Sequence, residues 1–161
     1  MAVDLQIADG VAATLVHAAF KEFSVGPVSG LDVLLRRVRD VVLDEQLERD
    51  VCLRVCDSAE SQDLNQTFRG RNTPTNILSF TAAGMDGVTT VPLGDLALCW
   101  PVAVAEAQQQ GKTVAHHVAH LCVHGVLHLL GYDHADDGDA EAMERIETQI
   151  LANLGVADPY M

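Results

Sequence analysis

The sequence predicts an α+β fold in which helices pack against one mixed, four-stranded β-sheet. Short runs with the period-two alternation of half-buried strands are interspersed with longer runs whose apolar residues recur at helical spacing. Their order along the chain, β-α-α-β-α-β-β-α-α-α, mixes the two kinds of element as α+β domains do. A length of 161 residues, 48% of them hydrophobic and 20% charged, suits a single domain over residues 1–161.

The first third of the chain is expected to hold one strand and two helices. Residues 3–8 alternate between apolar and polar side chains, which predicts a strand with one buried face. Asp9 is placed to cap a following helix that turns Leu15 inward. After a turn-rich break at residues 24–30, the apolar residues recur at helical spacing over residues 31–42.

The middle of the chain predicts three strands and one helix. The strands are expected over residues 49–56, 77–80 and 94–99. Asp57 opens the helix, which runs to Phe68 and ends in a turn, residues 69–76, that carries two arginines. Residues 81–93 form a long stretch of small residues, and loops of this length inside a domain are usually functional or mobile.

The last third is predicted to be helical. One helix covers residues 101–110, and Thr113 caps a second that runs to Leu130. A last helix follows the acidic stretch at residues 136–139. Its apolar face is predicted to consist of Ala142, Met143, Ile146, Ile150, Leu151 and Leu154.

Composition limits the environment and the partners of the chain. No apolar run reaches the roughly 18 residues of a membrane span, and the N-terminus lacks the basic region of a signal peptide. We therefore expect a cytoplasmic protein with no membrane contact and with its four cysteines reduced. Ten basic residues against 23 acidic ones give a net charge of −13, so any contact with nucleic acid is expected to be local and salt-sensitive.

The most informative stretch is H-G-V-L-H-L-L-G-Y-D-H, residues 124–134. His124 and His128 are four residues apart, so on a helix both imidazoles project from one face, as in the H-E-x-x-H zinc proteases. Gly131 can end that helix in a left-handed conformation and let the chain bring His134 over the same point. Three neutral imidazoles suit one Zn²⁺ ion per chain and leave a coordination position open, which is typical of catalytic sites.

The residue after the first histidine distinguishes this site from the proteases. They carry a glutamate there as general base, whereas this chain has Gly125. Water activation would fall to the metal itself or to a base elsewhere in the chain. His120, one turn before His124, is a candidate for contact with a ligand histidine or with substrate, or for a purely structural role. Asp133 is a candidate to orient a ligand imidazole. His116 and His117 are expected to face solvent or the rim of the site.

Three sequence blocks make the chain resemble the YbeY family of bacterial metal-dependent endoribonucleases. The blocks are L-N-Q-T-F-R-G-R-N-T-P-T-N-I-L-S-F (residues 64–80), L-G-D-L-A-L-C (residues 93–99) and H-H-V-A-H-L-C-V-H-G-V-L-H-L-L-G-Y-D-H (residues 116–134). Glycine in place of the protease glutamate is that family's own form. The resemblance covers most of residues 50–161, including the closing Asp158-Pro159-Tyr160, whereas the first 45 residues match poorly.

The resemblance implies zinc on His124, His128 and His134, and a functional arginine at Arg69. It also implies single-strand-specific cleavage of RNA, with roles in 3′-end maturation of small-subunit (16S) rRNA and in ribosome quality control, and with rRNA, the ribosome or ribosomal proteins as partners. An arginine suits such chemistry because its planar fork matches phosphate oxygens in two-point contact. Two alternatives stay open: a ribosome-assembly binding module with a structural zinc, and a metallopeptidase. The sequence does not fix an oligomeric state.

Overall fold

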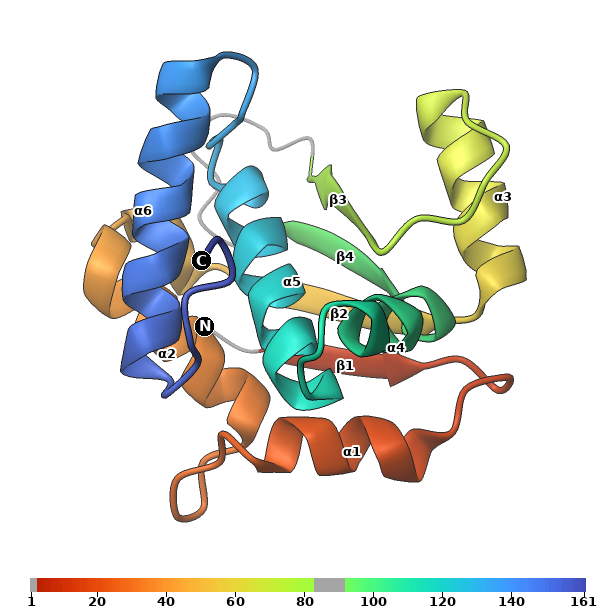
Figure 1. Ribbon diagram of the computed structural model, residues 1–161, viewed down its shortest axis with the longest axis horizontal. Helices are drawn as coiled ribbons and strands as arrows, with labels where there is room; N and C mark the ends of the chain where they lie inside the picture. The colour runs from red at the N-terminus through yellow and green to blue at the C-terminus, as the bar shows by residue number, and fades with distance from the viewer. Residues whose placement is uncertain (1–2, 83–91) are drawn as a thin grey trace.

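The computed structural model describes residues 3–82 and 92–161 and contains the predicted elements in the predicted order, with one 3-10 helix added (Figure 1). The elements are β1 (Val3–Ile7), α1 (Ala13–Lys21), α2 (Gly30–Val42), η1 (Glu45–Glu48), β2 (Val51–Cys56), α3 (Ser58–Arg69), β3 (Ile77–Thr81), β4 (Gly94–Cys99), α4 (Trp100–Gln109), α5 (Val114–Leu129) and α6 (Asp137–Asn153). The α+β prediction is confirmed. Most of the loop predicted at residues 81–93 lies outside the described residues. No helix in the described ranges is long and apolar enough to cross a membrane.

The four strands form one sheet in the order β1-β2-β4-β3. The first three run parallel to one another, and β3 pairs antiparallel with β4, which makes β3 an edge strand. The central strands β2 and β4 bury most of their residues, although Arg54 of β2 and Asp95 of β4 are at least partly exposed on one face of the sheet. Leu53 of β2 lies beside Leu5 of β1 on one side and Leu96 of β4 on the other. The sheet is therefore mixed, as predicted.

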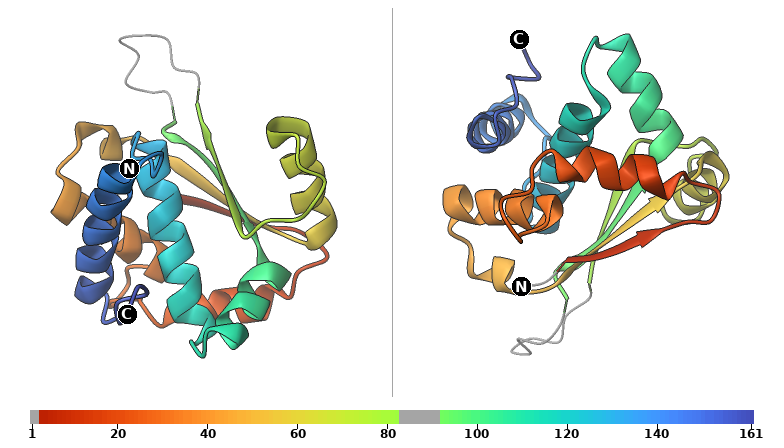
Figure 2. Two further views of the ribbon diagram at one scale, coloured as in Figure 1. Left: turned by 45° about the horizontal axis from the view of Figure 1, so that its top comes forward. Right: turned by 90° about the horizontal axis from the view of Figure 1, so that it is seen from below.

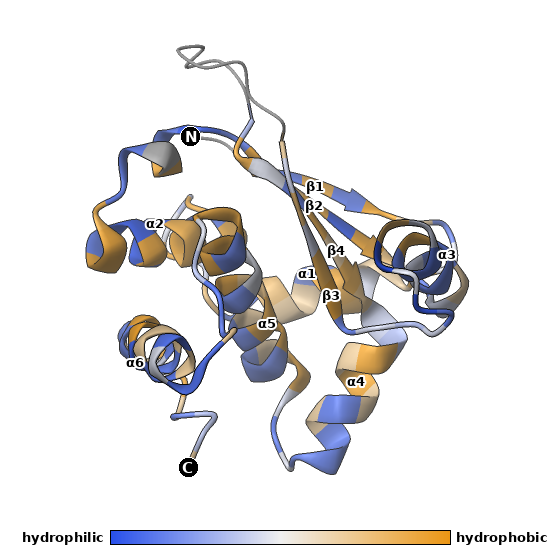
Figure 3. Ribbon diagram, turned by 90° about the horizontal axis from the view of Figure 1, so that it is seen from above, coloured by the Kyte–Doolittle hydropathy of each residue, from blue (hydrophilic) through white to orange (hydrophobic). Residues whose placement is uncertain are grey.

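Helix α5 lies in the middle of the helical layer, between the sheet and α6 (Figures 1 and 3). It packs against β3 and β4, while α1, α2 and α4 also contact it. Helix α3 lies on the opposite face of the sheet, where it contacts β4 (Figure 2). The residues of α5 that face these neighbours are almost all buried and apolar. The C-terminal half of α5, with His124 and His128, lines a pocket beside β3.

Helix α1 differs from its prediction. It begins at Ala13, and its N-cap residue is Ala12, whose side chain makes no capping hydrogen bond, so Asp9 is not the cap. The inward face consists of Val16, Ala19 and Phe20. Leu15, which was predicted to face inward, is 58% exposed because Phe20, the larger side chain, sets the buried face of the helix.

Candidate metal centre

Helix α5 places His124 and His128 one turn apart on the side that faces the pocket. The helix begins where the Thr113 side chain accepts a hydrogen bond from the backbone N–H of His116 at 3.2 Å. His124 and His128 are half-buried near the C-terminal end of the helix. The ring centroids of these two histidines lie 4.5 Å apart.

Gly131 ends the helix and turns the chain back toward the histidines. Its φ of 97° lies in the left-handed region that favours glycine. The backbone N–H of Tyr132 donates to the carbonyl of Leu127 at 3.0 Å, which closes the last turn. His134 then approaches His124 and His128, with ring centroids 5.6 Å and 5.1 Å away. One nitrogen from each of the three rings lies within 4.8 Å of the others, so the group can hold a metal ion.

Hydrogen bonds decide which nitrogen of each helical histidine faces the pocket. The Nδ1 of His128 lies 2.9 Å from the carbonyl oxygen of Tyr132, and the Nδ1 of His124 contacts the carboxylate of Glu147. Both partners can only accept, so both Nδ1 atoms carry the proton. The two Nε2 atoms, which are then acceptors, lie 2.9 Å apart. Two facing lone pairs repel each other unless a cation lies between them, so this donor set fits a metal ion.

The charge state of the rings is consistent with such a site. Burial lowers the pKa of His128, and the neighbouring His124 lowers it further. A lowered pKa favours the neutral ring that a metal requires.

Glu147 of α6 is a site residue that the sequence analysis missed. Its side chain is completely buried, and it accepts hydrogen bonds from His120, His124 and Tyr160. Burial alone would raise the pKa of this carboxyl, but the three hydrogen bonds outweigh it and hold the pKa at about 2. A signal was present in the sequence: Glu147 lies four residues after Met143 and four before Leu151, on the apolar face predicted for this helix.

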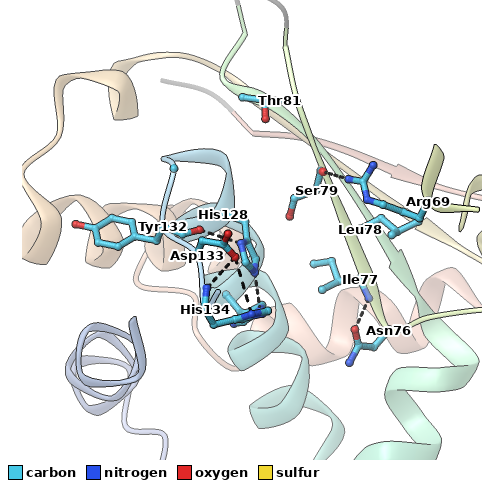
Figure 4. Close-up of a pocket in the computed structure, with 12 residues that line it drawn as sticks. Arg69, Asn76, Ile77, Leu78, Ser79, Thr81, His128, Tyr132, Asp133 and His134 are labelled. Atoms are coloured by element: carbon cyan, nitrogen blue, oxygen red, sulfur yellow. Dashed lines mark hydrogen bonds and ion pairs between the residues drawn. The ribbon is translucent and has the colours of Figure 1, made fainter. Parts of the chain in front are cut away.

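Arg69 lies on the opposite side of the pocket from His128 and His134 (Figure 4). It is the last residue of α3, and its guanidinium group reaches the edge strand β3. One Nη donates to the carbonyl of Ser79 at 2.9 Å and the other to the carbonyl of Phe68 at 3.2 Å. The Cζ atom lies 5.2 Å from the ring centroid of Phe80. The pocket between these sides has a volume of about 550 Å³.

Gly125 faces the sheet and not the pocket. A Cβ atom at this position would lie 2.9 Å from a methyl carbon of Leu96 and 3.0 Å from one of Ile77. The Ser79 hydroxyl donates to the Gly125 carbonyl at 3.1 Å. A glutamate at this position would have to displace the side chains of Leu96 and Ile77 and would point toward the sheet. The close contact between α5 and β3 brings the histidines and Arg69 to one pocket.

The other predicted candidates take different places. His120 does not line the pocket; its Nε2 lies 3.2 Å from both Glu147 and the Tyr160 hydroxyl. The carboxylate of Asp133 lines the pocket but accepts from the backbone N–H of His134 at 2.8 Å, while the His134 Nδ1 is 3.9 Å away. His117, expected at the surface, is buried, and its Nε2 lies 3.0 Å from Glu106. The partner that makes this burial possible lies on α4, which spacing within α5 could not reveal.

Comparison with known proteins decides the family. The family model described as "Endoribonuclease YbeY" matches residues 29–155. The chain belongs to the YbeY family. The match begins earlier than the three sequence blocks indicated and includes α2.

Relatives within the YbeY family extend this match. Two proteins named "Endoribonuclease YbeY", from Stenotrophomonas maltophilia strains R551-3 and K279a, are 54% and 53% identical to this chain over 117 residues. In both cases the match covers 70% of this chain and 73% of the relative. The solution structure of TM1509 from Thermotoga maritima shares the fold, with a TM-score of 0.53, 20% identity and 99% coverage of both chains.

Proposed function

We propose that this protein is a zinc-dependent endoribonuclease that cleaves single-stranded RNA in the cytoplasm. Its role would be 3′-end maturation of small-subunit (16S) rRNA and ribosome quality control. One observation carries the proposal: in a member of the YbeY family, three histidines converge on one side of a pocket and Arg69 lies on the other side. The name of the related proteins, endoribonuclease, supports the same reaction.

His124, His128 and His134 would hold one Zn²⁺ ion, for which nitrogen ligands are typical. When bound, the ion would polarise a phosphoryl oxygen and lower the pKa of a water molecule toward ~7. Three protein ligands would leave a coordination position facing the pocket. Asp133, whose carboxylate lines the pocket beside His134, would add negative charge near the ion.

Arg69 would bind the phosphate group of the substrate. Its contacts with Ser79, Phe68 and Phe80 fix the plane of the guanidinium before substrate arrives. They use two of its five N–H donors, so others are left for phosphate oxygens. A permanent positive charge that is oriented in advance stabilises the negative charge that develops during phosphodiester hydrolysis.

The shape of the site favours an unpaired strand. The histidines and Arg69 line a concave pocket, which a flexible single strand can enter with one phosphate. A stiff duplex presents its phosphates on a convex surface and would meet the rim. We therefore expect cleavage of loops and single-stranded ends of rRNA.

A cleavage assay on single-stranded rRNA tests this function. The wild type is compared with His124→Ala and Arg69→Ala, with Arg71→Ala as the matched control from the same turn, all purified identically. Both test variants are expected to lose activity, by on the order of 10²-fold or more for Arg69→Ala, while Arg71→Ala retains most of it. Equal activity in all four proteins would mean that a contaminating nuclease cleaves the RNA.

One observation favours a second candidate function. A net charge of −13 is unusual for a protein that binds RNA by itself, and it suits a ribosome-assembly module that binds ribosomal proteins and uses zinc structurally. In that case zinc-loaded wild type would bind the ribosomal partner without cutting RNA. The metallopeptidase alternative is disfavoured because Gly125 faces the sheet and supplies no base.

A further inference from the structure

We propose that Glu147 and Tyr160 together set the metal affinity of the three-histidine centre by acting on His124. The C-terminal end of the chain would then be a functional part of the metal centre. This inference rests on the proposed metal site and names two positioning residues that do not touch the metal.

The first observation is the environment of the Glu147 carboxylate. It is fully buried, and a buried carboxylate is stable only when it is paired and hydrogen-bonded. Its three partners are all donors: Nδ1 of His124, Nε2 of His120 and the hydroxyl of Tyr160. These donors come from α5 and from the C-terminal segment, so the carboxylate joins α6 to both.

The second observation is the direction of the hydrogen bond to His124. A carboxylate can only accept, so it keeps the proton of His124 on Nδ1 and leaves the lone pair of Nε2 facing His128 at 2.9 Å. A full negative charge behind the ring also makes Nε2 a stronger donor to a metal ion. His128 has only the neutral carbonyl of Tyr132 in the same place, so Glu147 acts on one ligand specifically.

The third observation is the way in which the chain end holds this carboxylate. The hydroxyl of Tyr160 donates to Glu147. The ring of Tyr160 packs edge-on against the ring of His120, with 5.5 Å between the ring centroids. Asp158 fixes the segment, because its carboxylate accepts from the backbone N–H of Tyr160 at 2.8 Å and from the Thr148 hydroxyl at 3.4 Å. Tyr160 thus contacts the buried carboxylate of Glu147, which in turn contacts His124, although the Tyr160 side chain itself is partly exposed.

Zinc titration of the 161-residue protein in competition with a chelator tests the proposal. The variants are Glu147→Gln and Tyr160→Phe, with Glu141→Gln as a control that removes an exposed carboxylate from the same helix. Glu147→Gln is expected to raise the Kd for Zn²⁺ about 10- to 100-fold, as loss of a partner behind a ligand histidine typically does. Tyr160→Phe is expected to raise it less, by on the order of tenfold, and Glu141→Gln to leave it unchanged.

A second measurement separates positioning from a structural role. In nitrogen NMR spectra of the zinc-free wild type, His124 is expected to carry its proton on Nδ1, and this preference should weaken in Glu147→Gln. A residue with only a structural role would lower the unfolding temperature and leave the tautomer of His124 and the zinc affinity of the folded protein unchanged. Tyr160→Phe and the wild-type spectrum decide the question even if Glu147→Gln does not fold.

The outcomes distinguish this inference from the proposed function. If the wild type binds zinc and cleaves RNA while folded Glu147→Gln binds zinc equally well, only the role of Glu147 is contradicted. The same holds if wild-type His124 carries its proton on Nε2. If the wild type binds no zinc, both the inference and the proposed function are contradicted.

Discussion

At the scale of single residues, two small residues, Gly125 and Ser79, lie between the histidine helix α5 and Arg69. Gly125 has no side chain and lets α5 approach the sheet closely. The Ser79 hydroxyl donates to the carbonyl of Gly125, and the Ser79 carbonyl accepts a hydrogen bond from Arg69. One short path of contacts therefore connects the histidine helix to the arginine.

The first residue-scale prediction concerns Gly125→Ala. The new methyl group would lie 2.9–3.0 Å from the side-chain tips of Leu96 and Ile77, and overpacking of this kind typically costs about 1–3 kcal/mol in the free energy of unfolding. Alanine gains about 1 kcal/mol over glycine in a helix, so Gly125→Ala is expected to be less stable than Gly138→Ala by the overpacking cost. Urea unfolding of the zinc-free protein measures it. Gly138→Ala is the control: a Cβ there meets only an Asp136 oxygen at 3.4 Å, so stability should hold or rise. Equal stability of the two variants would contradict the close packing of α5.

The second residue-scale prediction concerns Arg69→Lys. Lysine keeps the positive charge but cannot donate to Ser79, lie over Phe80 and present two further donors to phosphate. We expect RNA cleavage to fall by on the order of tenfold or more, with a smaller change in RNA binding. Single-turnover kinetics measure both quantities. A wild-type rate of RNA cleavage in Arg69→Lys would show that a positive charge at this position is sufficient and that the shape of the guanidinium is not needed.

At the scale of elements, α5 carries two histidines of the proposed metal site, His124 and His128, and a buried histidine, His117, that is expected to make the stability of the protein depend on pH. Burial lowers the pKa of His117, although its hydrogen bond to Glu106 opposes this, and Lys112 and His120 lower it further. The folded state thus binds fewer protons at this ring than the unfolded state, whose pKa is about 6.5. The stability contributed by His117 is therefore fully present above that value and is lost as the pH falls below it.

The corresponding element-scale experiment uses His117→Gln, which keeps a donor toward Glu106. Between about pH 7 and about pH 5, the free energy of unfolding of the zinc-free wild type is expected to fall more steeply than that of the variant. Urea unfolding at the two pH values measures the difference. An equal fall in the free energy of unfolding for the wild type and His117→Gln would contradict a lowered pKa of His117 in the folded protein.

The sequence predicted the elements well where local patterns determine them. The spacing of His124 and His128 and the glycine at position 131 suffice to predict how the histidines converge, because both are properties of one helix and its end. Glu147 and Tyr160 were missed because they reach His124 from another helix and from the chain end, which is tertiary packing. Leu15 was misplaced for a related reason: Phe20, four residues from Val16, sets the inward face of α1.

At the scale of the whole molecule, the acidic charge determines how RNA can bind. A chain with a net charge of −13 repels RNA at long range, so local attraction at the pocket must come from Arg69, which lines it. If Arg69 neutralises one phosphate, the slope of log K against log salt concentration should be about −0.7 for a single strand. Fluorescence anisotropy with a labelled oligonucleotide measures it, and a slope several times steeper would point to a larger basic surface.

The central claim is that three imidazoles hold one zinc ion and leave a position open. X-ray absorption at the zinc edge of the purified, zinc-loaded protein tests it most directly. We expect three nitrogen neighbours from histidine at about 2.0–2.1 Å and one further oxygen neighbour. Sulfur neighbours at about 2.3 Å, or a fourth protein ligand in place of that oxygen, would contradict it.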